Sequence, residues 1–252
     1  MTLSVIAFSA RNERAIVVLS LAAVVAAGLF ATFRLGDGVM IASMEGETGV
    51  AYTALLFAMW WTMMMAMMLP SAAPAILTFA GVSRKLSARS GSALPLVAFV
   101  TGYAAIWTGF SIVAVGLQLL LAQTIALDMM MATASVWIGG GLLVAAGLYQ
   151  MSPLKEACLH KCQAPLIYFA RHWQNGPAGA LRMGLSHGLY CVGCCWALMG
   201  LLFYGGVMEP RWIVGLAIYV AVEKLIPAGN RLSRFTGLIL VGWGVWNVWL
   251  AG

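Results

Sequence analysis

The chain has 252 residues, of which 62% are hydrophobic and 9% are charged. A soluble domain of ordinary composition carries about 25% charged residues, so this chain is too apolar for that class. We therefore expect a polytopic membrane protein. The net charge of +6 does not require a nucleic-acid partner, because the basic residues gather in short loops between apolar segments.

Apolar segments recur along the whole chain with short polar breaks between them. A transmembrane helix needs about 20 predominantly apolar residues, and most of the segments approach that length, although the fourth and sixth are short. The sequence predicts an all-α fold, a polytopic transmembrane helix bundle of about seven spans. Residues 1–252 form one membrane domain, with a cytoplasmic loop over 150–182. The predicted helices lie near 15–33, 50–69, 94–121, 134–149, 183–207, 212–226 and 235–250.

The first apolar segment is longer than the core of a signal peptide and lacks a small-residue cleavage site, so we expect a retained helix. Lysine and arginine residues indicate the orientation, since cytoplasmic loops carry an excess of them. With the N-terminus in the cytoplasm, Arg34 and Arg211 alone fall outside. We therefore expect a multi-pass membrane protein with its N-terminus in the cytoplasm and the lipid bilayer as its surroundings. The basic residues then inside are Arg11, Arg14, Arg84, Lys85, Arg89, Lys155, Lys161, Arg171, Arg182, Arg231 and Arg234.

The motif HGLYCVGCCW lies in the predicted fifth helix. At about 100° per residue, its histidine and three cysteines share one narrow helical face. A G-x-x-x-G spacing on the same face would let another helix approach closely. Cysteines in membrane helices can be small apolar packing residues, but a shared face with a histidine favours metal ligation or thiol chemistry. The residues are His187, Cys191, Cys194 and Cys195.

A second motif, CLHKC, places Cys158, His160 and Cys162 in the predicted cytoplasmic loop. Its C-x-x-x-C spacing puts both thiols on one side of a helical turn, or close together in a loop, but it is not the common zinc spacing. All five cysteines fall in the cytoplasm or the membrane, where disulfides are disfavoured. The motif is interpreted as an entry site or a lid over the buried cysteines.

Six methionines crowd the stretch MWWTMMMAMMLPS, which begins at Met59. Methionine fills gaps in apolar packing and is also a soft metal ligand, so both interpretations stay open. Either the row of Met59, Met63 and Met67 or the adjacent row of Met64 and Met68 is expected to face the interior, with Met63 and Met67 as auxiliary ligands. The other methionines are expected to form lipid-facing or packing surface. Pro70 and Pro74 are expected to end or kink this helix.

Ionisable residues at the end of a membrane helix require an explanation, because they are costly unless they are paired, reach the interface or serve a function. Lys224 is expected to extend its ammonium group to the interface. Glu223 is expected to pair with Arg231 or Lys224, or else to carry protons or accept a cation.

Three motifs carry a resemblance to a known family. In this order, MWWTMMMAMMLPS, YQMSPLKEACLHKC and HGLYCVGCCWALM resemble the prokaryotic domain-of-unknown-function 2182 family, described as predicted metal-binding integral membrane proteins. The resemblance extends from the second to the sixth predicted helix. It implies a copper-linked function in the prokaryotic cytoplasmic (inner) membrane, since members are sometimes labelled copper chaperones. It implies no particular reaction.

The donor set favours a soft cation. Thiolate and thioether ligands select Cu(I), and zinc is the second choice because cysteine and histidine also bind it. We expect a Cu(I) chaperone or carrier, or a protein that loads a membrane metalloenzyme, with a metal donor as a further partner. A thiol-disulfide relay and an accessory or assembly subunit are the alternatives. No ATP-binding loop, ATPase motif or hydrolase signature occurs, so any transport would be passive, proton-linked or handed on by a partner. A non-enzymatic role is favoured.

Overall fold

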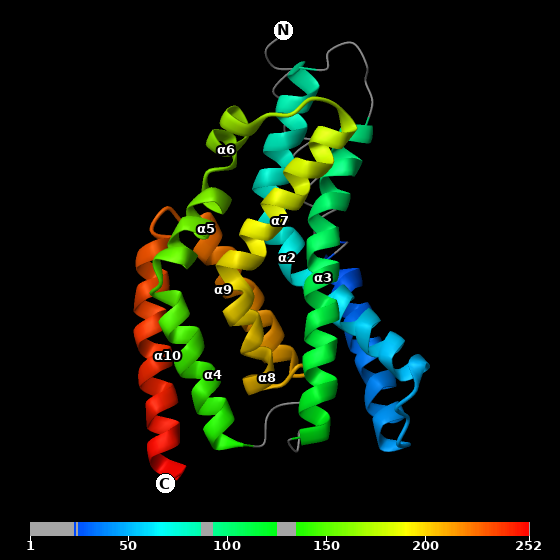
Figure 1. The fold of residues 1–252 in the computed structure, drawn as a ribbon, viewed down its shortest axis with the longest axis vertical. Helices are drawn as coiled ribbons and strands as arrows, with labels where there is room; N and C mark the ends of the chain where they lie inside the picture. Colours follow the sequence, from blue (N-terminus) through cyan, green and yellow to red (C-terminus); the bar gives the residue numbers. More distant parts are fainter. Residues whose placement is uncertain (1–22, 24, 87–92, 125–134, 252) are drawn as a thin grey trace, which may run out of the picture. The chain divides into compact units, whose positions relative to one another are not determined.

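The computed structural model describes residues 23, 25–86, 93–124 and 135–251 (Figure 1). Helices make up almost all of this part of the chain, and it contains no strand. The all-α prediction is therefore confirmed. The chain divides into two units, residues 1–70 and 71–252, which are described separately.

The first unit contains the helix Val25–Met44 and the first part of α2 (Val50–Leu86). The predicted span 15–33 ended too early, and its first residues lie outside the described part of the chain. Small residues bring the two helices together: the Thr32 and Thr62 hydroxyls are 3.2 Å apart, and a Cβ added at Gly28 would lie 3.0 Å from that of Ala66. This is the close packing that small residues permit between membrane helices.

Helix α2 does not end at its prolines, so of the two expected effects, an end or a kink, the first does not occur. It continues through Pro70 and Pro74 as far as Leu86. Proline removes one backbone hydrogen bond, but apolar membrane helices tolerate this because side-chain hydroxyls and neighbouring groups satisfy freed backbone atoms. Thr78 lies one turn after Pro74, and its hydroxyl donates to the Pro74 carbonyl oxygen at 2.7 Å.

In the second unit, α3 (Leu94–Thr124) runs against α7 (Gly176–Gly200). The G-x-x-x-G spacing on α7 has the predicted effect, because a Cβ at Gly184 would overlap the Phe99 carbonyl oxygen of α3. Glycine is therefore needed there for the close approach of two backbones. This contact fixes which face of α7 is turned towards α3.

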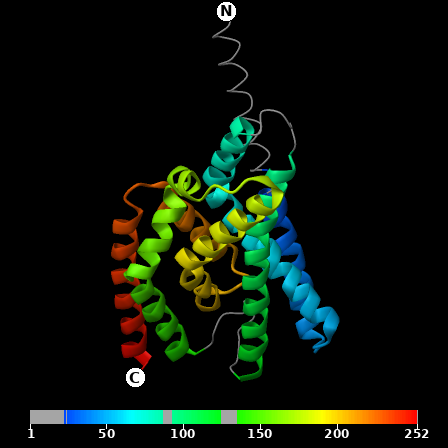
Figure 2. The ribbon, with the colours of Figure 1, turned by 45° about the horizontal axis from the view of Figure 1, so that its top comes forward.

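A second helix pair consists of α4 (Val136–Gln150) and α10 (Gly229–Ala251), which lie side by side in Figure 2. Glycines again permit the approach: a Cβ at Gly147 would lie 2.6 Å from the Gly237 carbonyl oxygen, and the reverse distance is 2.7 Å. The second unit is thus held together by two tightly packed helix pairs.

Residues 150–182 contain more helix than the predicted loop. They include α5 (Pro153–Gln163) and α6 (Pro165–His172), and α7 begins at Gly176 rather than at residue 183. The start of α5 has a sequence signal, since the Ser152 hydroxyl accepts the Lys155 backbone N–H at 3.2 Å, as a helix N-cap does. After α7 follow α8 (Leu202–Gly205) and α9 (Pro210–Leu225).

Among the described residues, four helices are long and apolar enough to cross a membrane: Val25–Met44, Val50–Arg84, Leu94–Gln123 and Gly176–Gly205. These helices fit a membrane protein. At about 1.5 Å per residue, the 15 residues of α4 and the 16 of α9 are shorter than a hydrocarbon core of about 30 Å. Seven spans therefore stays a prediction.

Candidate metal site

The buried centre of the second unit is the thiol face of α7. Cys191, Cys194 and Cys195 are between 0% and 1% exposed, and His187 is 3% exposed. The thiols of Cys194 and Cys195 donate to the Cys191 carbonyl oxygen at 3.1 and 2.9 Å. This local bonding leaves the Cys191 sulfur free to contact neighbouring helices.

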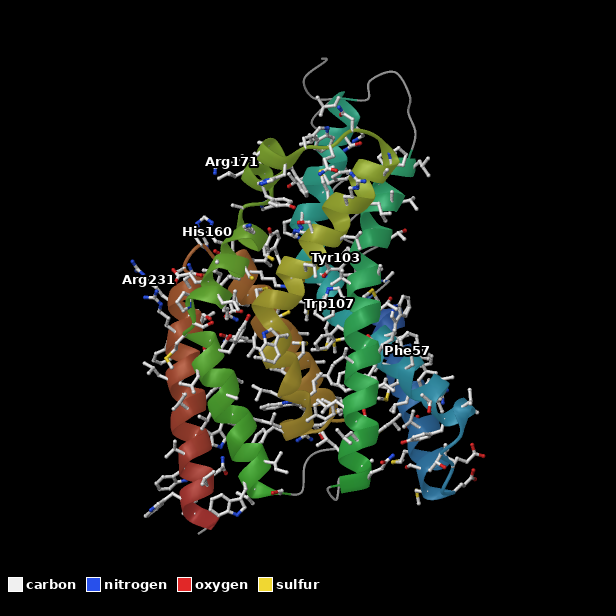
Figure 3. The ribbon with its side chains drawn as sticks, in the orientation of Figure 1. Phe57, Tyr103, Trp107, His160, Arg171 and Arg231 are labelled. Atoms are coloured by element: carbon white, nitrogen blue, oxygen red, sulfur yellow. The ribbon has the colours of Figure 1, made fainter. Side chains whose placement is uncertain are left out.

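Helix α3 supplies the first neighbour of this face. The Tyr103 hydroxyl lies 3.2 Å from the Cys191 sulfur. The Tyr103 ring, labelled with Trp107 in Figure 3, is also 6.0 Å from the His187 ring, and the Phe99 ring is 6.1 Å away. His187 Nδ1 is buried and has no hydrogen-bond partner within the described residues. A buried ring nitrogen without a partner has an unused capacity to bind.

Helix α5 brings the CLHKC cysteines to α7. The Cys162 and Cys194 thiols are within hydrogen-bonding reach of each other, and a Cβ at Gly193 would lie 2.9 Å from the Cys158 sulfur. Because α5 is helical, Cys158 and Cys162 share the face that meets α7. The two cysteine motifs therefore meet in one cluster, which we call the cysteine cluster: Cys158, Cys162, Cys191, Cys194 and Cys195.

His160 does not join the cysteine cluster. It lies two residues from each cysteine of its motif, which is about 200° around the helix, and its side chain is exposed on α5 (Figure 3). The sequence placed His160 among the metal ligands because of proximity along the chain. The helix turns it to the opposite side.

Both thiols of α5 have a pKa above the ordinary value of a cysteine. The hydrogen bond with Cys194, followed by burial, raises the pKa of Cys162 well above its ordinary value. Burial, with a smaller effect of Cys194, raises the pKa of Cys158 as well. Both thiols are therefore weaker nucleophiles at neutral pH than a free cysteine.

A buried ion pair lies beside the cluster. Lys155 Nζ is 2.8 Å from Glu223 Oε2, with side-chain exposures of 1% and 0%, and it also donates to the Cys194 carbonyl oxygen at 2.9 Å. Tyr219 and Gln150 donate to the other carboxylate oxygen at 3.1 and 3.5 Å. Glu223 thus pairs with Lys155, not with Arg231 or Lys224, and the pair joins α5, α7 and α9.

Lys224 points inwards, contrary to the expectation that it reaches the interface. Only 5% of it is exposed, and its ammonium donates to the Cys191 sulfur at 3.0 Å and to the Ser71 hydroxyl at 3.2 Å. Lys224 lies on the part of α9 that is close to α7. The Cys191 thiol of α7 is therefore within reach of the Lys224 ammonium and accepts its hydrogen bond. The sequence indicated that Lys224 is a costly ionisable residue at a helix end, but it did not identify the hydrogen-bond partners of the ammonium group.

The methionines of α2 belong to the first unit. Met63 and Met67 are 0% and 1% exposed, and Met65, expected at the opposite surface, is only 8% exposed. All six methionines of the run are buried, which agrees with the packing alternative and not with a lipid-facing surface. Their role as auxiliary ligands stays a prediction.

No group of three histidine, cysteine, aspartate or glutamate side chains in the described residues has an arrangement that could hold a metal ion. Donors from two different helices do meet, since the thiols of Cys162 on α5 and Cys194 on α7 lie within hydrogen-bonding reach of each other. Soft monovalent copper accepts a small number of thiolate ligands, whereas structural zinc needs four ligands. A pair of thiols is therefore compatible with copper.

The contact between α5 and α7 predicts a specific cross-link. Mild oxidation of the metal-free protein in detergent should join Cys162 to Cys194, because thiols within hydrogen-bonding reach need little movement to form a disulfide. Trypsin and non-reducing mass spectrometry should then detect peptide 162–171 linked to peptide 183–211. The Cys162→Ser variant is the control, and a wild-type protein without this linked peptide would contradict the contact.

Sequence reasoning missed Lys155 and Tyr103, which contact residues of the cluster, and Ser71, which accepts a hydrogen bond from Lys224. Lys155 was assigned to a cytoplasmic loop on the strength of its charge. The N-cap signal of Ser152 before Pro153 could have placed it in a helix. Nothing in the sequence marks Tyr103 or Ser71, because their contacts depend on how the helices pack.

Comparison with known proteins gives one match. A family model described as PpoB2, copper chaperone, matches residues 57–247, which include α5, α7 and α9. No curated protein and no solved structure matches the chain.

Proposed function

Because the chain belongs to the PpoB2 copper chaperone family, we propose that it is an integral membrane protein that binds Cu(I) at the cysteine cluster and passes it to a partner. The observation that carries the proposal is the meeting of Cys162 and Cys194 from two separate motifs. Copper is the cargo here, and the receiver is a metal-dependent protein at the same membrane.

The chemistry of the donors supports Cu(I). A thiolate in an apolar interior is costly unless a cation neutralises it, so binding of the ion and completion of the site are coupled. Cys162 and Cys194 are the proposed principal ligands, with Cys191 and Cys195 beside them. His187 is the next candidate because its buried Nδ1 has no hydrogen-bond partner in the described chain.

Cys158 is proposed as the entry ligand of the cluster. It is less buried than the three α7 cysteines, and its sulfur packs against Gly193 of α7. An ion arriving from a donor would meet this thiol before the buried ones. The proposed orientation places α5 on the cytoplasmic side, which the basic loops support. Met63 and Met67, in the first unit, are proposed as softer auxiliary ligands.

A thiol-disulfide relay is the second candidate, because Cys162 and Cys194 lie close together. A relay needs an attacking thiolate at neutral pH. The raised pKa values of Cys158 and Cys162 disfavour that reaction on α5. Ligand exchange to copper is the better use of such thiols, since the metal itself displaces the proton.

The proposal predicts that the purified protein takes up Cu(I) under reducing conditions and gives it up to a thiol-containing acceptor. The measurement is copper per protein after loading in detergent and desalting, followed by transfer to an acceptor across a size-exclusion step. The test variant is Cys191→Ser, Cys194→Ser, Cys195→Ser, which removes the three α7 thiols and should bind less copper than the wild type. Thermal unfolding checks that this variant is folded. Equal copper content in the wild type and this variant would reject the site.

A further inference from the structure

Lys224 differs from the other buried charged groups of the second unit because no carboxylate balances it. Lys155 and Glu223 form an ion pair, so their charges cancel. In the part of the chain that the structure describes, no aspartate or glutamate pairs with Lys224. Its hydrogen bonds go to the Cys191 sulfur and the Ser71 hydroxyl. A buried ammonium ion is costly unless a neighbouring negative charge compensates it.

The sulfur atoms are the groups able to supply that negative charge. The Lys224 ammonium is close enough to interact electrostatically with the thiols of the cluster, and metal-bound cysteine is a thiolate. The thiols concerned are Cys162, Cys191, Cys194 and Cys195.

The charge of the metal determines whether this compensation succeeds. A monovalent cation held by two thiolates leaves one negative charge, which a single ammonium ion cancels. A divalent cation held by the same two thiolates is already neutral, so the ammonium ion beside it stays unbalanced. In a low-dielectric interior this difference is large, because charges interact strongly there.

Resting on the proposed function, we infer that Lys224 is a specificity-determining residue that makes the cysteine cluster prefer a monovalent over a divalent soft cation. The ammonium ion acts as the counter-charge of the bis-thiolate complex and is not itself a ligand. Its position beside the Cys191 sulfur, at 3.0 Å, puts the charge next to the metal ligands.

The test compares Cu(I) and Zn(II) affinities of the full-length protein in detergent, each measured by competition with a chromogenic chelator. Lys224→Gln keeps a hydrogen-bond donor but removes the charge, so Cu(I) should bind roughly 100-fold more weakly, as when one member of a buried charge pair is lost. Zn(II) affinity should stay the same or rise. Lys224→Arg keeps the charge and should keep the wild-type preference.

Two further variants make the outcome unambiguous. Lys161→Gln is the matched control, because Lys161 donates to the Tyr190 hydroxyl at 2.8 Å and its loss should not change the preference. Ser71→Asp leaves Lys224 in place but gives it a carboxylate partner, so the Cu(I) preference should fall even where Lys224→Gln does not fold.

Equal weakening of Cu(I) and Zn(II) in a folded Lys224→Gln protein, or an unchanged preference in Ser71→Asp, would overturn the inference while leaving copper binding intact. A wild-type protein that binds no Cu(I) would overturn the proposed function as well. The two failures are therefore distinguishable.

Discussion

Cys162→Ser is expected to lower Cu(I) affinity as strongly as Cys194→Ser, by about 100-fold or more. Residues that merely support metal ligands cost about 10-fold to 100-fold when they are lost, so a direct ligand should cost at least the upper value. The expectation follows from the contact of the two thiols across α5 and α7. The measurement is Cu(I) affinity by chelator competition under reducing conditions.

Two controls separate a shared site from two independent ones. His160→Ala removes the exposed histidine of the same motif and should leave Cu(I) affinity unchanged. The double variant Cys162→Ser, Cys194→Ser should be little worse than either single variant, because residues of one site are not additive. Losses that add in full would show that α5 and α7 bind copper separately.

Glu223→Gln is expected to reduce the free energy of unfolding of the metal-free protein by about 3–5 kcal/mol, the usual result of removing one member of a buried ion pair. The variant leaves the Lys155 ammonium buried, at 1% side-chain exposure, without a compensating charge. Glutamine can still accept hydrogen bonds from Tyr219 and Gln150, so the effect isolates the charge. Denaturant unfolding in detergent, followed by tryptophan fluorescence, measures it.

A second substitution should rescue this variant. Lys155→Met in the Glu223→Gln background removes the unbalanced charge, and a buried pair replaced by neutral groups of similar volume is often nearly neutral in stability. The exposed pair of Glu156 and Arg234, at 2.8 Å, provides the matched control. Glu156→Gln should cost less than about 1 kcal/mol. A double variant less stable than Glu223→Gln alone would contradict the charge argument.

The helices themselves were largely predictable, since their apolar composition and length follow from the needs of a membrane span. The structure differs from the prediction where a rule based on single residues or on local polarity was used to place the end of a helix. Pro70 and Pro74 were expected to end or kink a helix, but α2 continues through both. Likewise, the polar segment 150–182 was taken for a loop although it contains Ser152 at the start of a helix.

The sequence by itself determined which side chains share a face. Helical periodicity alone placed His187, Cys191, Cys194 and Cys195 on one side of α7, and it put Cys158 and Cys162 on one side of a helical turn. These relations depend on a fixed rotation per residue, so they need no knowledge of any other helix.

Only the tertiary structure decided which faces meet. The contact of Cys162 with Cys194, the pairing of Lys155 with Glu223, and the inward direction of Lys224 depend on how α5, α7 and α9 pack. A charged residue is assigned to solvent by its type, but its position is set by the partners that packing brings within hydrogen-bonding distance. Glycine contacts such as that of Gly184 with α3 set how closely two helices approach, and no periodicity within a single helix reveals which helices will meet.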